Sequence, residues 1–412
     1  MVSSPTNTSN YFVHTLLRAR DWQHRPEFDR VCDWWRAGGT GVCGLVGMGG
    51  AGKTAIVDRF LRMLPGVMPQ NRNIPKDDTL PTPNSTFVFS FYDAPNVETF
   101  FQSLHMWLMQ SPDVVNAVSY SQLLFRMQNT EPGLIVLDGL EKVQDDGIRG
   151  IFGQLSAPNL RDFVKRAANG YFPRLSVLIT TRFPLADLQE EQPDFFQSIP
   201  IEDIDISTGI SLLKRRGVWG SELELERIVK ECGNHALTVD LAGGYINEYG
   251  NGDPKTLLKL VTTDELDEAV QNEQDPAKRA VLKQNKRFAR EAQRYQEAML
   301  EKDPAAIALL ERICLFRLGV EAKTLTAIFT GEDAAKISGE ALAELTAQQL
   351  QRKLDWLVQM RIIEVTRIRY RQSGKTRTLY NIHPAVRDGF VQGIGRDSVT
   401  VSHQAIRIGL EV

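Results

Sequence analysis

The chain has 412 residues and a mass of 46.3 kDa, which exceeds what one compact core ordinarily holds, so we expect about two to four structural units. Hydrophobic residues make up 42% of the chain and charged residues 24%, and these globular proportions exclude a largely disordered or fibrous protein. The formal net charge of -3 and the pI near 6.1 exclude a global attraction to nucleic acid or to acidic membranes and leave only local basic patches for such partners.

The N-terminus, MVSSPTNTSNYFV, carries neither the basic start nor the apolar run of a secretory signal. No apolar stretch of about 18 residues, the length that spans a bilayer, occurs elsewhere. We therefore expect a cytoplasmic protein with no membrane partner. The cysteines form no CxxC pair and are interpreted as reduced packing residues. They are Cys32, Cys43, Cys232 and Cys314.

The N-terminal half has the pattern of an α/β domain. Residues 1–24 are polar and are interpreted as a flexible lead. Between residues 25 and 200, short apolar runs alternate with amphipathic stretches, which predicts βαβ units and a parallel, doubly wound sheet. The predicted strands are Val42–Val46, Phe87–Phe91, Leu134–Leu137 and Val177–Thr180.

The remainder of the chain is predicted to be helical up to a hairpin near its end. Residues 201–262 show helical periodicity and predict a small helical domain, and the charged residues 263–303 predict connecting helices. Residues 304–395 carry apolar helices followed by two alternating runs, joined at Ser373 and Gly374, which predicts a winged-helix domain. Residues 396–412 are interpreted as a tail that begins a further C-terminal region.

A phosphate-binding loop follows the first predicted strand. The string GMGGAGKT matches GxxxxGK[ST] and lies between an apolar strand and an amphipathic helix, the context that the motif requires. Glycines let backbone N–H groups approach a phosphate, and the lysine neutralises its oxygens. A chance glycine-rich turn is the alternative. The predicted nucleotide contacts are Gly47, Gly49, Gly50, Ala51, Gly52, Lys53 and Thr54.

Two further strands end in charged residues. Leu134–Leu137 is followed by Asp138, which together with the Thr54 hydroxyl is predicted to hold Mg²⁺. Glu141 is a candidate to polarise the attacking water, or else a solvated loop acid. Arg182 ends the string VLITTR that begins at Val177, and it is predicted to sense a γ-phosphate, or else to be an exposed arginine at a strand end.

The order of these motifs, followed by GNHAL at residues 233–237 and by IHP at residues 382–384, resembles the nucleotide-binding core of STAND proteins, particularly bacterial NB-ARC-like members. The resemblance covers roughly residues 24–392. It implies an α/β P-loop NTPase domain followed by a small helical domain and a winged helix.

The resemblance also assigns site residues outside the P-loop. His235 and Ala236 stand where the family has its GLPLA-like motif, with Ala236 in place of the usual proline. His383 resembles the histidine of the MHD motif, which contacts the β-phosphate of ADP, although Pro384 replaces the aspartate. Arg25 matches a GRE-like adenine-site motif. A plain core histidine is the alternative interpretation of His383.

The function that the resemblance implies is an ADP/ATP-dependent signalling switch, closed with ADP and self-associating with ATP, at most a slow ATPase, which works with an effector or sensor partner in bacterial defence or regulation. A DNA-binding regulator is the second hypothesis, because basic residues crowd the predicted hairpin. A turnover ATPase is the third. The basic residues are Arg361, Arg367, Arg369, Arg371, Lys375 and Arg377.

Overall fold

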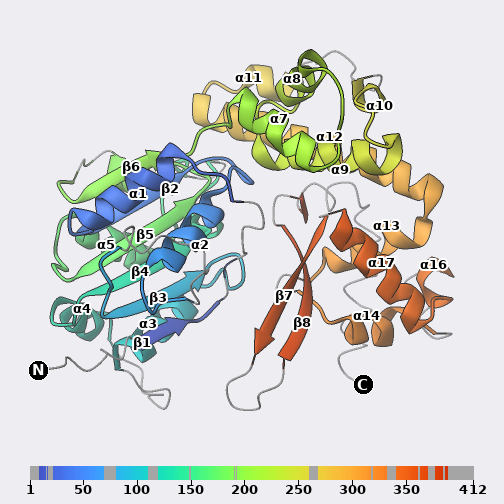
Figure 1. Cartoon of the computed structure of the whole chain (residues 1–412). Coiled ribbons are helices and arrows are strands. Elements are labelled where there is room, and N and C mark those ends of the chain that lie inside the picture. The colour runs from blue at the N-terminus through green and yellow to red at the C-terminus, as the bar shows by residue number, and fades with distance from the viewer. Residues whose placement is uncertain are drawn as a thin grey trace, which may run out of the picture. The chain divides into compact units, whose positions relative to one another are not determined.

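A computed structural model gives the fold. It describes residues 9–14, 16, 22–68, 80–109, 119–147, 150–189, 191, 193–258, 268–316, 319–331, 340–360, 362–369, 376–383, 386 and 387. The chain divides into two compact units, residues 1–202 and residues 203–412 (Figure 1).

The first unit is built on a six-stranded sheet in which every neighbouring pair of strands is parallel. The strands lie in the order β1-β3-β4-β5-β2-β6. The prediction of a parallel α/β sheet is therefore confirmed. The strands are β1 (Ser9–Phe12), β2 (Gly41–Val46), β3 (Ser85–Ser90), β4 (Gly133–Asp138), β5 (Leu175–Thr181) and β6 (Phe196–Pro200).

Helices cover both faces of this sheet. Successive side chains of a strand point to opposite faces, so each strand contributes to the packing on both sides. Alternate residues of β4 show the division: Leu134 and Val136 pack with α1 and α2, whereas Ile135 and Leu137 pack with α3, α4 and α5. The helices are α1 (Pro26–Arg36), α2 (Lys53–Met63), α3 (Val97–Met109), α4 (Tyr120–Gln128), α5 (Pro158–Ala168) and the short α6 (Ala186–Gln189), with a 3₁₀ turn at Leu140–Val143.

The expectation of a flexible lead over residues 1–24 is wrong for residues 9–12. These residues form the edge strand β1, which pairs with β3 in the register Ser9↔Ser85 to Phe12↔Val88. The segment has only two polar and two aromatic residues, and its backbone hydrogen bonds to β3, rather than a longer apolar run, make it a strand. The other edge strand, β6, also lies outside the predicted strands. Its sequence, FQSIP, contains no continuous apolar run, and Ile199 is its one fully buried side chain.

The four cysteines are buried, as predicted, and so are both tryptophans of α1, Trp34 and Trp35. Trp35 packs edge-to-face against Phe60 of α2, with ring centroids 5.9 Å apart. No helix among the described residues is both long enough and apolar enough to cross a membrane.

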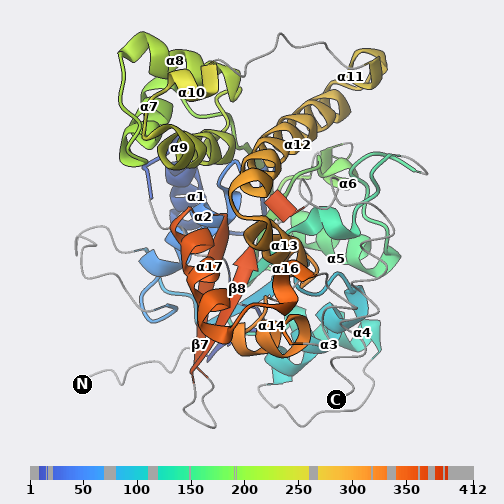
Figure 2. The ribbon, with the colours of Figure 1, turned by 90° about the vertical axis from the view of Figure 1, so that its right-hand side faces the viewer.

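The second unit begins with helices and has one hydrophobic core. Its long helix α12 (Pro276–Lys302) is seen along most of its length in Figure 2. The Tyr295 hydroxyl on α12 donates to the carbonyl of Leu241 on α9 over 2.6 Å, which joins the two helices. The helices are α7 (Ile206–Arg215), α8 (Glu222–Glu231), α9 (Ala236–Gly250), α10 (Lys255–Leu258), α11 (Glu268–Asn272), α12, α13 (Pro304–Ile313), α14 (Ala322–Phe329), α16 (Glu340–Ala343) and α17 (Ala347–Gln359).

The predicted hairpin is present in the second unit. Strand β7 (Ile363–Arg369) pairs antiparallel with β8 (Thr376–Ile382) in the register Ile363↔Ile382 to Arg369↔Thr376. The winged-helix assignment of the surrounding helices stays a prediction. Arg361, Ser373, Gly374, Arg371 and Lys375 lie outside the described residues.

Only one basic side chain of the hairpin is described. Arg377 is exposed, and its Nε lies 3.8 Å from Glu321 Oε1. This pair offers no indication of a nucleic-acid surface, so the DNA-binding hypothesis stays a prediction.

Candidate nucleotide-binding site

The predicted phosphate-binding loop connects β2 to α2 at the carboxyl edge of the sheet. Gly50 and Gly52 have φ values of 82° and 99°, which side chains other than glycine rarely adopt. Gly52 is the N-cap of α2, no side chain caps this helix end, and its first turn carries no acidic residue. The N–H groups of the first turn and the positive end of the helix dipole are therefore suited to an anion.

Lys53 lies inside the loop that precedes it. Lys53 is only 5% exposed, and its ammonium donates to the carbonyls of Gly47 and Met48 over 2.6 and 2.8 Å. Burial, with a smaller contribution from the nearby Arg182, lowers the pKa of Lys53 to about 8, although Glu141 and Asp138 oppose the change. The loop thus holds a cation at the place where the motif requires one.

Asp138 ends strand β4 and lies beside the start of α2. Its Oδ1 accepts hydrogen bonds from the Thr54 hydroxyl at 2.9 Å and from the Thr180 hydroxyl at 2.7 Å. The Thr180 hydroxyl in turn accepts from the backbone N–H of Gly139 over 3.0 Å. Burial raises the pKa of Asp138, an effect that the hydrogen bonds from Thr180 and Thr54 partly offset.

These donors fit the magnesium ion that the motif implies. A hydroxyl and a buried carboxylate, held 2.9 Å apart beside the phosphate-binding loop, are hard oxygen ligands of the kind that Mg²⁺ prefers when phosphates and water complete its shell. Such an ion would neutralise the charge of a bound phosphate. Thr54 and Asp138 are the residues that would hold it.

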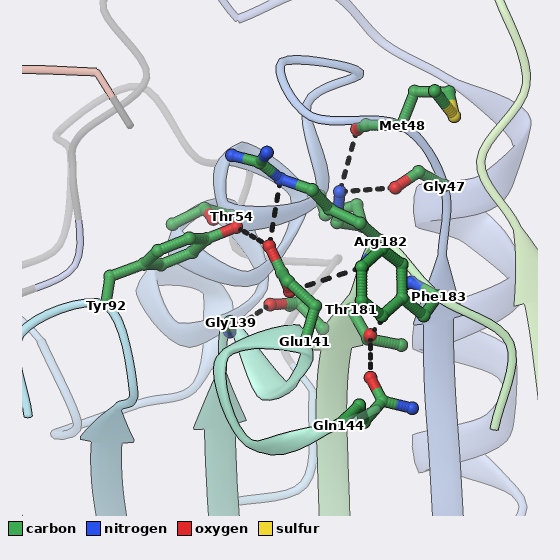
Figure 3. Close-up of polar contacts among 12 residues, drawn as sticks. Gly47, Met48, Thr54, Tyr92, Gly139, Glu141, Gln144, Thr181, Arg182 and Phe183 are labelled. Carbon is green, nitrogen blue, oxygen red and sulfur yellow. Dashed lines mark hydrogen bonds and ion pairs between the residues drawn. The ribbon is translucent and has the colours of Figure 1, made fainter. Parts of the chain in front are cut away.

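Glu141 lies in the 3₁₀ turn that follows Asp138, and its carboxylate is buried. Its Oε1 accepts from the hydroxyl of Tyr92 and pairs with Arg182 Nε at 2.9 Å, while its Oε2 accepts from the Arg182 backbone N–H at 3.2 Å (Figure 3). Neither alternative from the sequence, a solvated acid or an exposed arginine, describes this buried pair. The motifs did not identify Tyr92 or Thr180.

Arg182 extends from the end of β5 over the phosphate-binding loop. A Cβ added at Gly49 would lie 2.8 Å from the Arg182 Cζ atom, so this glycine allows the guanidinium to approach the loop backbone. The side chain of Arg182 is 13% exposed. The guanidinium of Arg182, which directly follows β5, therefore lies at the same edge of the sheet as Lys53 and Glu141.

Arg25 contacts the phosphate-binding loop at Ala51. Its guanidinium donates to the carbonyl of Ala51 over 2.6 Å and to the carbonyl of Glu202 over 2.6 Å. The same group pairs with Glu27, with Arg25 Nη2 2.7 Å from Glu27 Oε1. Arg25 thus contacts the phosphate-binding loop through protein atoms, and its predicted contact with adenine stays a prediction.

The remaining predicted contacts belong to the second unit. His235 is the N-cap of α9, where its side chain accepts from the Thr238 N–H at 3.4 Å, and the residue is 1% exposed. Ala236 begins that helix. His383 follows β8, is half-buried, and its carbonyl accepts from the Arg387 N–H over 2.9 Å. Roles for these residues at the nucleotide stay predictions.

Known structures share this architecture. A STAND protein with a tetratricopeptide repeat sensor from Pyrococcus horikoshii aligns over 94% of the chain, with a TM-score of 0.53 and 14% identity. The chain therefore has the fold of a STAND P-loop ATPase. It spans 45% of the length of the P. horikoshii protein.

Two other solved structures are more distant. A Walker-type ATPase from Pyrococcus abyssi aligns over 92% of this chain and 99% of its own, with 12% identity and a TM-score of 0.37. The Aeropyrum pernix ORC1 protein in complex with DNA aligns over 89% of this chain and 91% of its own, with 14% identity and a TM-score of 0.34. No known protein-family profile matches the sequence, and no curated protein matches it significantly.

Proposed function

We propose that the protein is a nucleotide-controlled signalling switch of the STAND class, in which ADP stabilises a closed state and ATP favours opening and self-association. The observation that carries this proposal is the arrangement at the carboxyl edge of the sheet. There the Lys53 ammonium, the Thr54–Asp138 pair and the Arg182–Glu141 pair lie on the elements that surround one phosphate-binding loop.

The state of Glu141 favours slow hydrolysis over rapid turnover. A carboxylate that removes a proton from water needs a free lone pair directed at that water. Glu141 Oε1 accepts from the Tyr92 hydroxyl and forms an ion pair with Arg182 Nε, and Oε2 accepts from the Arg182 backbone N–H, so both oxygens already face donors within the protein. A slow ATPase suits a switch, because the lifetime of bound ATP then sets how long the open state lasts.

The energetic requirement of such a switch is substantial. Moving an equilibrium from mostly closed to mostly open requires the two nucleotides to prefer opposite states by roughly 10⁴-fold, or about 5.5 kcal/mol. We propose that His383 supplies part of this preference by contacting ADP. The family resemblance and the position of His383 directly after β8 support this assignment.

The first experiment is to denature purified protein and identify the released nucleotide by chromatography. Stoichiometric ADP would support a closed switch, whereas an empty protein that hydrolyses many ATP molecules per second as a monomer would support a turnover ATPase. Light scattering of the same preparation with ADP or with a non-hydrolysable ATP analogue then tests self-association. An unchanged mass in both nucleotides would contradict the switch.

The histidine is tested separately. His383→Ala should lose ADP faster and self-associate more readily than the wild type. His24→Ala is the matched control, because His24 is an exposed histidine that pairs with Asp29 at 2.8 Å. Equal ADP retention in the three proteins would remove the role assigned to His383.

A further inference from the structure

Three helices of the second unit, α9, α12 and α17, meet at one joint. The buried Tyr295 hydroxyl of α12 donates to the Leu241 carbonyl of α9 over 2.6 Å. A Cβ added at Gly244 of α9 would lie 2.9 Å from that hydroxyl oxygen and 3.3 Å from the carbonyl oxygen of Met360, the C-cap of α17. Gly244 therefore allows the three helices to approach one another at a single point.

Aromatic side chains extend the contact between α9 and α12. The rings of Tyr295 and Tyr245 meet edge-to-face with centroids 5.5 Å apart, and Lys302 Nζ at the end of α12 lies 4.5 Å from the centroid of the Tyr249 ring. Aromatic pairs and cations over aromatic faces stabilise a contact beyond the effect of burial alone. Helix α12 is thus fastened to α9 at two places that lie about two turns apart.

Helix α17 closes the joint. Its Trp356 indole donates to Glu248 Oε1 of α9 over 3.1 Å, and its Lys353 ammonium donates to the two carboxylate oxygens of Asp303 over 2.7 and 2.6 Å. Asp303 directly follows α12 and is the N-cap of α13. The helix that precedes the hairpin is therefore bonded to α9 and to the junction of α12 with α13.

One hydrophobic core runs through the joint. It extends from Ile204, ahead of α7, to Val386, beyond β8, and residues 203–412 form one compact unit. Neighbouring domains move relative to each other when their interface is small and polar, whereas a large hydrophobic interface holds them together. Helices α7–α9 and helices α13–α17 share this core and are expected to move together.

The connection between the two units is short and is held at each end. Glu202 is the last residue of the first unit, and its carbonyl accepts from Arg25 Nη2 over 2.6 Å. Ile204 is buried in the core of the second unit and donates its N–H to the Asn234 carbonyl over 2.8 Å. Asp203 is the one residue between these two anchored positions.

We propose that helices α7–α9 do not separate from helices α13–α17 when the nucleotide is exchanged, and that the second unit instead reorients as one body about Asp203. This inference rests on the proposed function, since it concerns the motion by which the switch opens. A hinge of one residue can absorb a large change in φ and ψ, and it leaves the buried core of the joint intact. Separation of α9 from α17 would expose that core to water.

Distances between spin labels test this motion directly. Asn247→Cys on α9 with Asp355→Cys on α17 reports on the joint, and Ser121→Cys on α4 with Asp355→Cys reports on the connection between the units. All three positions are exposed. The four native cysteines are buried, so the wild type should take up little label and serves as the control. Pulsed electron paramagnetic resonance measures each pair with ADP and with a non-hydrolysable ATP analogue.

We expect the same distance for the Asn247–Asp355 pair in both nucleotides and a shifted distance for the Ser121–Asp355 pair. A shift in the Asn247–Asp355 pair would overturn the inference and leave the switch proposal intact, because the second unit would then open at the joint. No shift in either pair would contradict the nucleotide switch and this inference together.

Proline tests the hinge itself. Asp203→Pro fixes the φ angle of this residue and should slow release of a fluorescent ADP analogue by roughly fivefold to thirtyfold, the scale of restricting one backbone residue. Asp203→Gly is the matched comparison, because it removes the same side chain and leaves φ unrestricted, and it should release the analogue at least as fast as the wild type. Unslowed release from an Asp203→Pro protein that melts like the wild type would overturn the hinge.

Discussion

The Thr54 hydroxyl donates to Asp138 Oδ1 over 2.9 Å, although 84 positions separate the two residues in the sequence. This contact joins the first turn of α2 to the end of β4. It places the two oxygen ligands expected for Mg²⁺ next to each other, and Asp138 holds this position despite the cost of burying its charge.

Asp138→Asn should therefore separate stability from function. Burial raises the pKa of Asp138, so ionisation of this carboxyl lowers the stability of the folded protein. The penalty is absent below the ordinary aspartate pKa and fully present above the raised value. At about pH 7.5 and without nucleotide, Asp138→Asn should melt at a higher temperature than the wild type. With ATP present, the variant should lack the additional stabilisation that Mg²⁺ gives the wild type.

Thermal scans of both proteins, with and without Mg²⁺–ATP, measure this effect. Asp162→Asn is the contrasting control. Desolvation acts to raise the pKa of Asp162, but hydrogen bonds from Arg166 and Tyr120 outweigh it and lower that pKa, so its removal should destabilise the protein. A nucleotide-free Asp138→Asn variant that melts below the wild type would contradict the conclusion that the buried charge of Asp138 lowers stability.

Lys53→Ala should abolish nucleotide binding, because the loop then lacks the cation that contacts the phosphates. A ligand at about 100 times its Kd stabilises a folded protein by roughly 2.7 kcal/mol, so the rise in Tm on adding nucleotide should disappear. Lys165→Ala is the control, since Lys165 pairs with Glu191 outside the site. Normal nucleotide content in purified Lys53→Ala would disprove this role.

Nucleotide affinity should weaken in alkaline buffer. The pKa of Lys53 is lowered to about 8. The charged ammonium therefore lowers the stability of the folded protein in full below about pH 8, and this destabilisation disappears as the pH rises toward the ordinary lysine pKa. Phosphate binding requires the ammonium, and the Kd should therefore rise above about pH 8 by up to tenfold per unit.

Titration of the Kd between about pH 7 and pH 9.5 tests the role of the ammonium. Lys53→Arg provides the comparison, because its guanidinium keeps its charge throughout this range. The affinity of this variant will be lower overall, since the planar guanidinium does not fit the position of the lysine ammonium. Its Kd should nevertheless not change with pH. Parallel slopes for the two proteins would assign the pH dependence to another group.

Arg25→Ala should destabilise the first unit by about 3–5 kcal/mol, the usual cost of leaving the partner of a buried ion pair alone. The side chains of Arg25 and Glu27 are 14% and 11% exposed, and Arg25 also holds the carbonyls of Ala51 and Glu202. The Arg25→Ala/Glu27→Ala variant should recover part of this loss. Urea unfolding measures both, and a double variant less stable than the single would contradict the pairing.

Local patterns in the sequence were sufficient to predict several strands and the phosphate-binding loop of the first unit. An apolar run that ends in Asp138, and a glycine-rich string before an amphipathic helix, predicted β4 and the loop between β2 and α2. These signals succeed because buried parallel strands need continuous apolar residues and a phosphate-binding loop needs glycines at fixed spacing. The edge strand β1 gave no such signal, because its four residues, SNYF, contain no continuous apolar run.

The sequence by itself determined which side chains could bind phosphate and magnesium, because the type and spacing of those residues follow from the chemistry of the ligand. Only the tertiary structure decided that Tyr92 bonds to Glu141 and that Arg25 clamps Ala51 and Glu202. These partners are 49, 26 and 177 positions apart. Contacts at such separations depend on which strands become neighbours in the sheet, and no local periodicity carries that information.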